Sequence, residues 1–322
     1  MTRKSTDDEF IAAWTQLGSP TLVGKRLGIS SRSAMMRRRS IEARYGLTLA
    51  TEADQRVVQQ SNTITHAHDQ VRSVVNIRGT VIVFSDAHYM PGEPSIGHQA
   101  LLVLIKRLKP ALIIANGDLL DGGSIHNHQP IGWETGRPTL RQELDALIKR
   151  MDEVRKATKG MGTILHRTIG NHDIRFDKRL AAMVPEYKDI GGTQLKDHLP
   201  EWSASWSALI NDSVMVKHRL HSGLHSTYNN VLRAGLTAMV CGHTHMLEVK
   251  PIGNYRGRHW GVSTGMLADP SDGAFLYRED APVHWCQGFA VLTFSDDGRL
   301  RPPELCEVID HTAYFRGSIV DI

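Results

Sequence analysis

Gly117-Asp118-Leu119-Leu120-Asp121 follows an apolar run, residues 111–115, in this chain of 322 residues. A short apolar run that ends in a turn signal is typical of a buried β-strand. Both aspartates then fall at the carboxyl end of that strand, where open α/β sheets hold their ligands. The stretch therefore predicts an α/β fold with an acidic site at the end of a strand.

Four further polar motifs repeat this arrangement after the apolar runs 81–84, 163–165, 214–216 and 238–240. They are Asp86-Ala87-His88, Gly170-Asn171-His172-Asp173, His218 and Gly242-His243-Thr244-His245. Any one of them also occurs as an ordinary polar loop, but five in this order indicate one shared site. Carboxylate, imidazole and amide oxygen together suit divalent ions such as Mn, Fe, Zn or Ni.

These motifs, in this order, resemble those of the calcineurin-like metallophosphoesterase superfamily over residues 79 to about 265. The resemblance implies a hydrolase of phosphoric esters whose α/β domain, residues 75–322, is a two-sheet sandwich flanked by helices. The run Lys217-His218-Arg219 and the long insert after the second motif look most like phage-encoded phosphoesterases. We therefore expect a bacterial host cytoplasm as the location.

The resemblance also implies a site for two divalent ions, with Mn favoured over Fe, Zn, Ni or Mg. Asp118 would bridge the ions, and six further ligands would complete the two positions: Asp86, His88 and His245 for one, Asn171, His218 and His243 for the other. Ions roughly 3.5–4 Å apart can share a hydroxide for in-line attack, so no protein base is needed. His172 would be the general acid, oriented by Asp121.

Two features leave alternatives open. His221 lies close behind His218, but we favour His218 because it directly ends its strand. Arg175 and Arg219 each follow a ligand closely and are expected to grip phosphate, although ordinary surface ion pairs would explain them equally well. The protein Ser/Thr phosphatase branch has an arginine after the second motif, where this chain has Gly122-Gly123, so a phosphoprotein substrate is disfavoured.

Charge is concentrated in the first fifty residues. They hold 9 Lys/Arg against 4 Asp/Glu, a net of +5, and the remaining residues hold 29 against 30, a net of −1. The three cysteines have no paired spacing, which fits a reducing compartment. The first residues have no apolar signal core and no run of eighteen apolar residues occurs, so we expect a protein with no membrane partner.

The N-terminal residues 1–50 resemble a small all-α helix-turn-helix module. Helical spacing predicts helices over 9–17, 21–27 and about 31–45, separated by glycine turns. In the third helix Arg32 is expected near bases, and Arg37, Arg38 and Arg39 on phosphates. A helical module that docks on protein is the alternative. Residues 51–74 are polar and are expected to be a linker.

Beyond the motifs, the sequence predicts a cleft wall over 122–139 and a helix over 140–159. Strands of a second sheet are expected at 247–249, 260–262 and 289–294. The leading functional hypothesis is a metal-dependent phosphodiesterase or nuclease that acts on nucleic acid. A nucleotide phosphatase or cyclic phosphodiesterase is the second hypothesis. The third is a phage regulatory or structural factor that only binds nucleic acid, against which the presence of both His172 and Asp121 argues.

Overall fold

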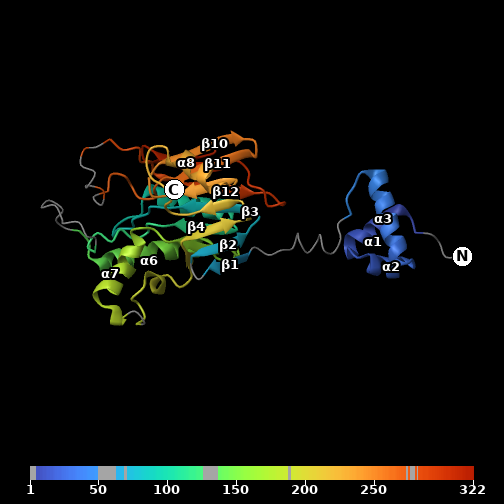
Figure 1. The fold of residues 1–322 in the computed structure, drawn as a ribbon, viewed down its shortest axis with the longest axis horizontal. Helices are drawn as coiled ribbons and strands as arrows, with labels where there is room; N and C mark the ends of the chain where they lie inside the picture. Colours follow the sequence, from blue (N-terminus) through green and yellow to red (C-terminus); the bar gives the residue numbers. More distant parts are fainter. Residues whose placement is uncertain are drawn as a thin grey trace. The chain divides into compact units, whose positions relative to one another are not determined.

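The computed structural model describes residues 5–49, 63–68, 71–125, 137–187, 190–272, 275, 280 and 282–322. The chain divides into two compact units, Met1–Ser61 and Asn62–Ile322 (Figure 1). Each unit has a hydrophobic core of its own.

The first unit is an all-α module. Its helices are α1 (Asp7–Leu17), α2 (Pro20–Leu27) and α3 (Ser31–Tyr45). Each begins close to its predicted start and ends at a glycine with positive φ. One apolar face of each helix forms the core, which includes Phe10, Trp14, Val23, Ala34 and Ile41. The three predicted helices are therefore confirmed.

The second unit contains two mixed β-sheets. The eight-stranded sheet has the order β15-β14-β13-β12-β3-β4-β5-β6. Its strands are β3 (Gly79–Phe84), β4 (Leu112–Asn116), β5 (Ile164–Thr168), β6 (Ser203–Ser205), β12 (Gly288–Phe294), β13 (Glu304–Ile309), β14 (Thr312–Phe315) and β15 (Ser318–Ile319). The seven-stranded sheet has the order β1-β2-β7-β8-β9-β11-β10. Its strands are β1 (Thr63–His68), β2 (Arg72–Asn76), β7 (Ser207–Ile210), β8 (Val214–Val216), β9 (Ala238–Cys241), β10 (Leu247–Asn254) and β11 (Gly257–Thr264).

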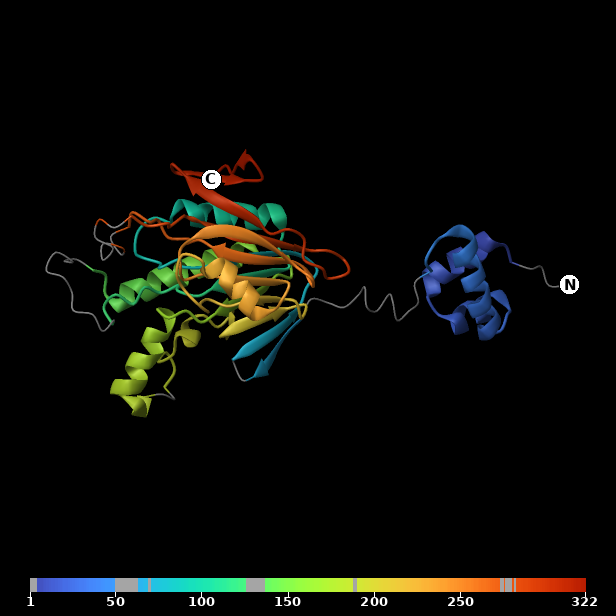
Figure 2. The same ribbon diagram turned by 45° about the horizontal axis from the view of Figure 1, so that its top comes forward.

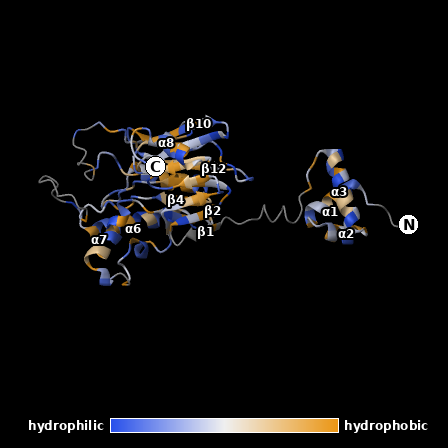
Figure 3. Cartoon of the chain, viewed as in Figure 1, coloured by the Kyte–Doolittle hydropathy of each residue, from blue (hydrophilic) through white to orange (hydrophobic). Residues whose placement is uncertain are grey.

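The two sheets pack face to face, with helices on the outside (Figures 1 and 2). Side chains alternate along β3: Val81 and Val83 join the core between the sheets, while Ile82 and Phe84 join the core under the helices. The helices on the eight-stranded sheet are α5 (Ile96–Leu108), α6 (Leu140–Ala157) and α7 (Asp173–Met183), and α8 (Ser226–Ala234) covers the other sheet. Strands β4 and β12, in the middle of the eight-stranded sheet, are among the hydrophobic segments in Figure 3. The expected two-sheet sandwich is confirmed.

Two details differ from the sequence-based expectations. Strand β1 and the first three residues of β2 fall in the stretch 51–74 that was expected to be a linker, and both strands belong to the seven-stranded sheet. The segment 63–68 has only one large apolar side chain, Ile64, which suits a polar edge strand paired on one side. Strand β12 pairs with β3 of the first sheet, not with β10 and β11, because the cross-strand partners of 290–294 are residues 79–83.

Candidate metal centre

The polar motifs lie in the segments that follow five strands at one end of the sandwich. These segments carry Asp86 and His88 after β3, Asp118 and Asp121 after β4, Asn171 and His172 after β5, His218 after β8, and His243 and His245 after β9. Strands β3, β4 and β5 are parallel neighbours, and so are β8 and β9 of the other sheet. The site is therefore assembled from both sheets.

Five of these side chains stand on a left-handed backbone. The φ angles are 51° at Asp86, 37° at His88, 51° at Asp118, 69° at His243 and 58° at His245. Such conformations in residues other than glycine require about 1–3 kcal/mol each, and they persist only where surrounding contacts impose them. Repeated strain in successive loops is typical of a functional site.

Two groups of possible metal ligands share no residue: Asp86, His88 and His245, and Asp118, His218 and His243. A third possible group, His88, Asp121 and His172, overlaps the first at His88. Within each group, one ligand atom per residue lies within 4.8 Å of the others. His245 Nε2 is 3.2 Å from Asp86 Oδ1, and His218 Nε2 is 3.1 Å from Asp118 Oδ2. The two groups are connected, because His243 N–H donates to Asp86 Oδ2 at 2.9 Å.

Asn171 is held beside the second group by its neighbours. His172 N–H donates to Asp118 Oδ1 at 2.8 Å, and a Cβ added to Gly170 would lie only 2.1 Å from that oxygen. Only glycine therefore fits at position 170, and the close approach places Asn171 next to Asp118.

Several nitrogen and oxygen atoms of these side chains that could bind a metal ion are buried without a hydrogen-bond partner within the described part of the chain. They are His88 Nε2, Asn171 Oδ1 and His245 Nδ1. Buried polar atoms are nearly always paired, so such atoms at one place indicate a missing ligand. Imidazole nitrogen, carboxylate and amide oxygen are the donors that borderline divalent ions take. The residues present therefore fit divalent metal ions.

Buried carboxylates dominate the electrostatics of the site. Burial acts to raise the pKa of Asp118, but the imidazoles of His218, His172 and His88 bring that pKa well below its ordinary value. Burial acts to lower the pKa of His218, yet Asp118 and Asp86 raise it to about 9. The carboxylates thus remain charged at neutral pH and favour cations.

Asp121 contacts two histidines through different atoms. Its carboxylate Oδ1 lies 2.9 Å from His88 Nδ1, the arrangement that orients a metal-binding imidazole. Its backbone carbonyl accepts the Nδ1–H of His172 at 2.9 Å, whereas Oδ1 is 3.4 Å from that nitrogen. Arg175 donates to the same carbonyl at 3.0 Å and to His172 Nε2 at 3.0 Å.

Asp173 is the residue whose importance the sequence did not indicate. It is 1% exposed, and its carboxylate accepts four backbone N–H groups, those of Asp118, Leu119, Leu120 and Gly170. It therefore ties the loop after β4 to the loop after β5. The position of Asp173 in the first turn of α7 could have indicated this role, because helix N-termini favour negatively charged side chains.

Helix α6 holds the segment behind His88. Arg150 donates to the carbonyl of Gly92 at 2.6 Å and pairs with Glu153 at 2.8 Å. Glu153 lies 3.0 Å from His98 Nε2, and the other ring nitrogen of His98 lies 3.0 Å from the hydroxyl of Tyr89. Because Tyr89 follows His88 directly, this network fixes the backbone at His88.

The remaining residues expected at the site differ in how close they lie to the two ligand groups. His218 is buried in its group, whereas His221 is exposed, interacts with Arg233 at 2.9 Å and belongs to neither group. Arg175 lies against His172, as described above. Arg219 is exposed and close enough to His243 to contribute to lowering its pKa, after the larger effects of burial and His218. Of the insert expected to wall the cleft, residues 126–136 lie outside the described residues.

In the first unit, the four arginines expected at nucleic acid are not equivalent. Arg37 donates to Ser5 Oγ at 2.7 Å and to Asp7 at 3.1 Å, and it lies over the ring of Phe10. Arg38 pairs with Glu42 at 2.9 Å and lies over the ring of Trp14. Arg32 and Arg39 are exposed. The structure thus leaves these last two as the more accessible cations of α3.

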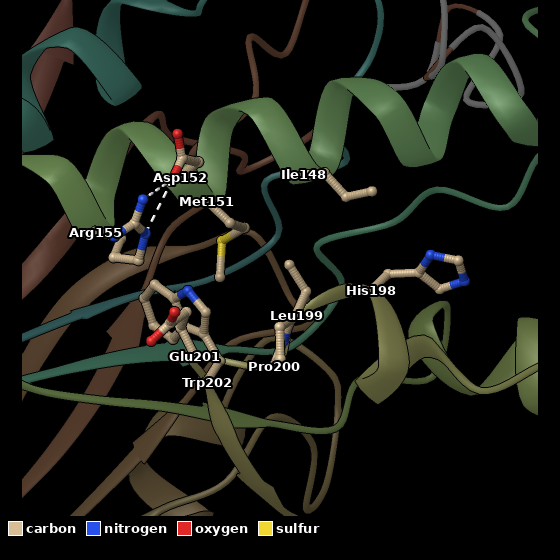
Figure 4. Close-up of a pocket in the computed structure, with 9 residues that line it drawn as sticks. All are labelled: Ile148, Met151, Asp152, Arg155, His198, Leu199, Pro200, Glu201 and Trp202. Carbon is tan, nitrogen blue, oxygen red and sulfur yellow. Dashed lines mark hydrogen bonds and ion pairs between the residues drawn. The ribbon is translucent and has the colours of Figure 1, made fainter. Parts of the chain in front are cut away.

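A cavity of about 270 Å³ lies elsewhere, between α6 and residues 198–202 (Figure 4). Met151, Leu199 and Trp202 give it apolar walls, and Asp152 pairs with Arg155 at its rim at 2.5 Å. None of its lining residues belongs to the ligand groups, so it is separate from the metal centre. Within the described residues, no helix is both long and apolar enough to cross a membrane.

Comparison with known proteins agrees with this geometry. The sequence profile of the calcineurin-like phosphoesterase family (Metallophos) matches residues 79–247, just over half of the chain. No curated protein sequence matches.

Solved structures with a similar fold include wild-type Vps29 complexed with zinc from Entamoeba histolytica, with 13% identity, a TM-score of 0.41, and 75% of this chain and 99% of that chain covered. Vacuolar Protein Sorting 29 from Cryptosporidium parvum has 11% identity, a TM-score of 0.39 and coverages of 76% and 98%. A dimetal phosphatase from Danio rerio has 12% identity, a TM-score of 0.34 and coverages of 71% and 95%.

Proposed function

The chain belongs to the calcineurin-like phosphoesterase family and is a metal-dependent phosphoesterase, and from this premise we propose that it hydrolyses phosphodiester bonds of nucleic acid. The observation that carries the proposal is the combination of a metal-ligand site in one unit with a basic three-helix module in the other.

We assign the ligands as two sets that share Asp118. Asp86, His88 and His245 would complete one set, and Asn171, His218 and His243 the other. The unpartnered buried atoms of His88, Asn171 and His245, and the short distance between His218 Nε2 and the Asp118 carboxylate, support this assignment. Two bound divalent ions, which we take to be Mn, would polarise the phosphate and lower the pKa of the attacking water.

His172 would protonate the leaving oxygen. Its Nδ1–H is committed to the carbonyl of Asp121, so Nε2 is the atom that faces the reaction. Arg175 lies 3.0 Å from Nε2 in this structure. When Nε2 carries the proton it no longer accepts from Arg175, so the guanidinium is available to take a phosphate oxygen near His172. Arg219, exposed near His243, would also hold the phosphate.

The N-terminal module supports nucleic acid as the substrate. A Cβ on Gly24 of α2 would lie 2.7 Å from the carbonyl of Ile29, so glycine is needed for the tight turn into α3. Helices α2 and α3 together are similar to a helix-turn-helix. Arg32 lies near the start of α3, and Arg39 lies two turns further along it. We propose that these two residues contact nucleic acid, and that Arg37 and Arg38 chiefly stabilise the module.

Hydrolysis assays with Mn on single-stranded DNA, duplex DNA, RNA and cyclic nucleotides test the proposal. Higher kcat/KM on a polynucleotide than on any cyclic nucleotide or nucleoside monophosphate is the expected result. The reverse order would assign the enzyme to small nucleotides as a phosphatase or cyclic phosphodiesterase and overturn the proposed substrate.

A further inference from the structure

The peptide bond between Asp121 and Gly122 is held on both sides. Its carbonyl accepts hydrogen bonds from His172 and Arg175, as described above. Its N–H, contributed by Gly122, donates to Glu143 Oε2 at 2.7 Å. The orientation of this one peptide plane therefore determines where the carbonyl holds the ring of His172.

Glu143 is well placed to fix that plane. It lies in the first turn of α6 and is fully buried. The helix is itself immobilised: Thr139 and Gln142 form a capping box at its start, and Leu147 and Met151 are buried in the core. A carboxyl group attached to such a helix presents a rigid acceptor.

The turn has little freedom to find another acceptor. Gly122 has a φ of 64°, the left-handed region that favours glycine. A Cβ at Gly123 would lie 2.9 Å from Asp121 Oδ2 and 3.7 Å from Glu143 Oε1, so the chain passes closely between the two carboxyl groups. Glu143 Oε1 has no hydrogen-bond partner among the described residues, and burying it carries a free-energy penalty.

We propose that Glu143 is a positioning residue for His172: its carboxyl group fixes the Asp121–Gly122 peptide, whose carbonyl orients the imidazole for proton donation to the leaving group. The inference rests on the proposed role of His172. Glu143 itself touches neither the substrate nor the reacting atoms.

The test compares Glu143→Met, which keeps the volume and removes the acceptor, with Glu143→Gln, which keeps an acceptor oxygen. Both are assayed on a dinucleotide, whose leaving alkoxide needs a proton, and on bis(p-nitrophenyl) phosphate, whose p-nitrophenolate does not. Glu143→Met should lose roughly 10- to 100-fold in kcat on the dinucleotide, with KM and bound metal unchanged and little loss on the nitrophenyl ester. Glu143→Gln should retain most activity on both.

Leu147→Ala is the matched structural control, because it weakens the same helix from its buried face without touching the turn. It should lower the melting temperature and affect both substrates equally. Exchange of the Gly122 amide, followed by NMR, gives a readout independent of catalysis. It should be slow in the native protein and in Glu143→Gln, and fast in Glu143→Met.

Two outcomes overturn the proposal: an equal loss on both substrates in Glu143→Met, or a loss of bound metal that accounts for its activity. His172→Ala separates this failure from failure of the proposed function. If His172→Ala lowers kcat by the same factor on both substrates, the assignment of His172 as the acid is wrong. If His172→Ala lowers kcat mainly on the dinucleotide and Glu143→Met does not, only the role proposed for Glu143 is wrong. In the double variant the two losses should not add, because both act through one imidazole.

Discussion

The carboxylate of Asp173 accepts the backbone N–H of Asp118 at 3.0 Å, across two different strand ends. Because Asp118 has a φ of 51°, its conformation depends on such external contacts. The same carboxylate also accepts the N–H of Leu119, Leu120 and Gly170. One buried side chain thus holds the loop that carries the proposed bridging ligand.

Asp173→Asn should destabilise the protein by about 2–4 kcal/mol, since an amide nitrogen would face backbone donors that then lack an acceptor. Urea unfolding measures the change. Asp145→Asn, on the exposed face of α6, is the control and should have an effect within about 0.5 kcal/mol. If Asp173→Asn and that control unfolded at the same urea concentration, the carboxylate of Asp173 would not be holding the loop.

Asp118→Asn should abolish turnover and lower metal occupancy at both positions, because one carboxylate is proposed to serve both ions. Elemental analysis of the purified variant measures the occupancy. Two full equivalents of metal in the variant would sink the bridging assignment.

His172→Ala should keep both metal ions yet lose on the order of 10²–10⁴ in kcat on a substrate with a poor leaving group. The loss should shrink on a p-nitrophenyl ester, because p-nitrophenolate leaves without a proton. Steady-state kinetics on both substrates provide the measurement. Equal losses would instead indicate a structural or ligand role for His172.

Glu143 should make the stability of the protein depend on pH. Burial, with a smaller contribution from Asp121, raises its pKa from 4.5 to about 7. A raised pKa means that the folded state binds the proton more tightly, so this contribution is complete below pH 4.5 and is lost as pH rises through 7. Between pH 4.5 and pH 8 the native protein should lose on the order of 3 kcal/mol relative to Glu143→Gln. Urea unfolding of both proteins at several pH values checks this, and parallel curves would contradict it.

Deleting residues 1–61 should leave hydrolysis of small phosphodiesters nearly unchanged, because every proposed ligand lies at Asp86 or beyond. The cut is placed before β1 so that the seven-stranded sheet stays whole. Nucleic-acid affinity should fall, and the slope of log K against log salt should flatten by about 2 if Arg32 and Arg39 each contact one phosphate. An unchanged affinity and slope in the folded truncated protein would reassign the module to docking on protein.

Sequence reasoning succeeded where the determinants are local. Each ligand motif is preceded by its own apolar run, so the strands and the convergence of their ends could be predicted from neighbouring residues. The pairing partners of β12 could not, because the choice between two sheets depends on contacts with residues about 200 positions away.

The same distinction explains what was missed in the site and in the module. The four N–H groups that Asp173 accepts come from two loops that meet only in the folded chain. The family resemblance implied that Asp121 would lie beside His172, but not that its carbonyl would be the nearer acceptor. Arg37 looked available in a basic run, and its pairing with Asp7, thirty residues earlier, is a product of helix packing.

Helix α6 also links the activity of this enzyme to local unfolding. It holds the Asp121 turn through Glu143 and the segment after His88 through Arg150 and Glu153. Partial opening that detached this single helix would free both loops while the strands of the sheets stayed paired. Local opening requires less free energy than complete unfolding. Conditions that detached this helix would therefore inactivate the enzyme while its sheets stayed paired, so a lost activity would not imply a lost fold.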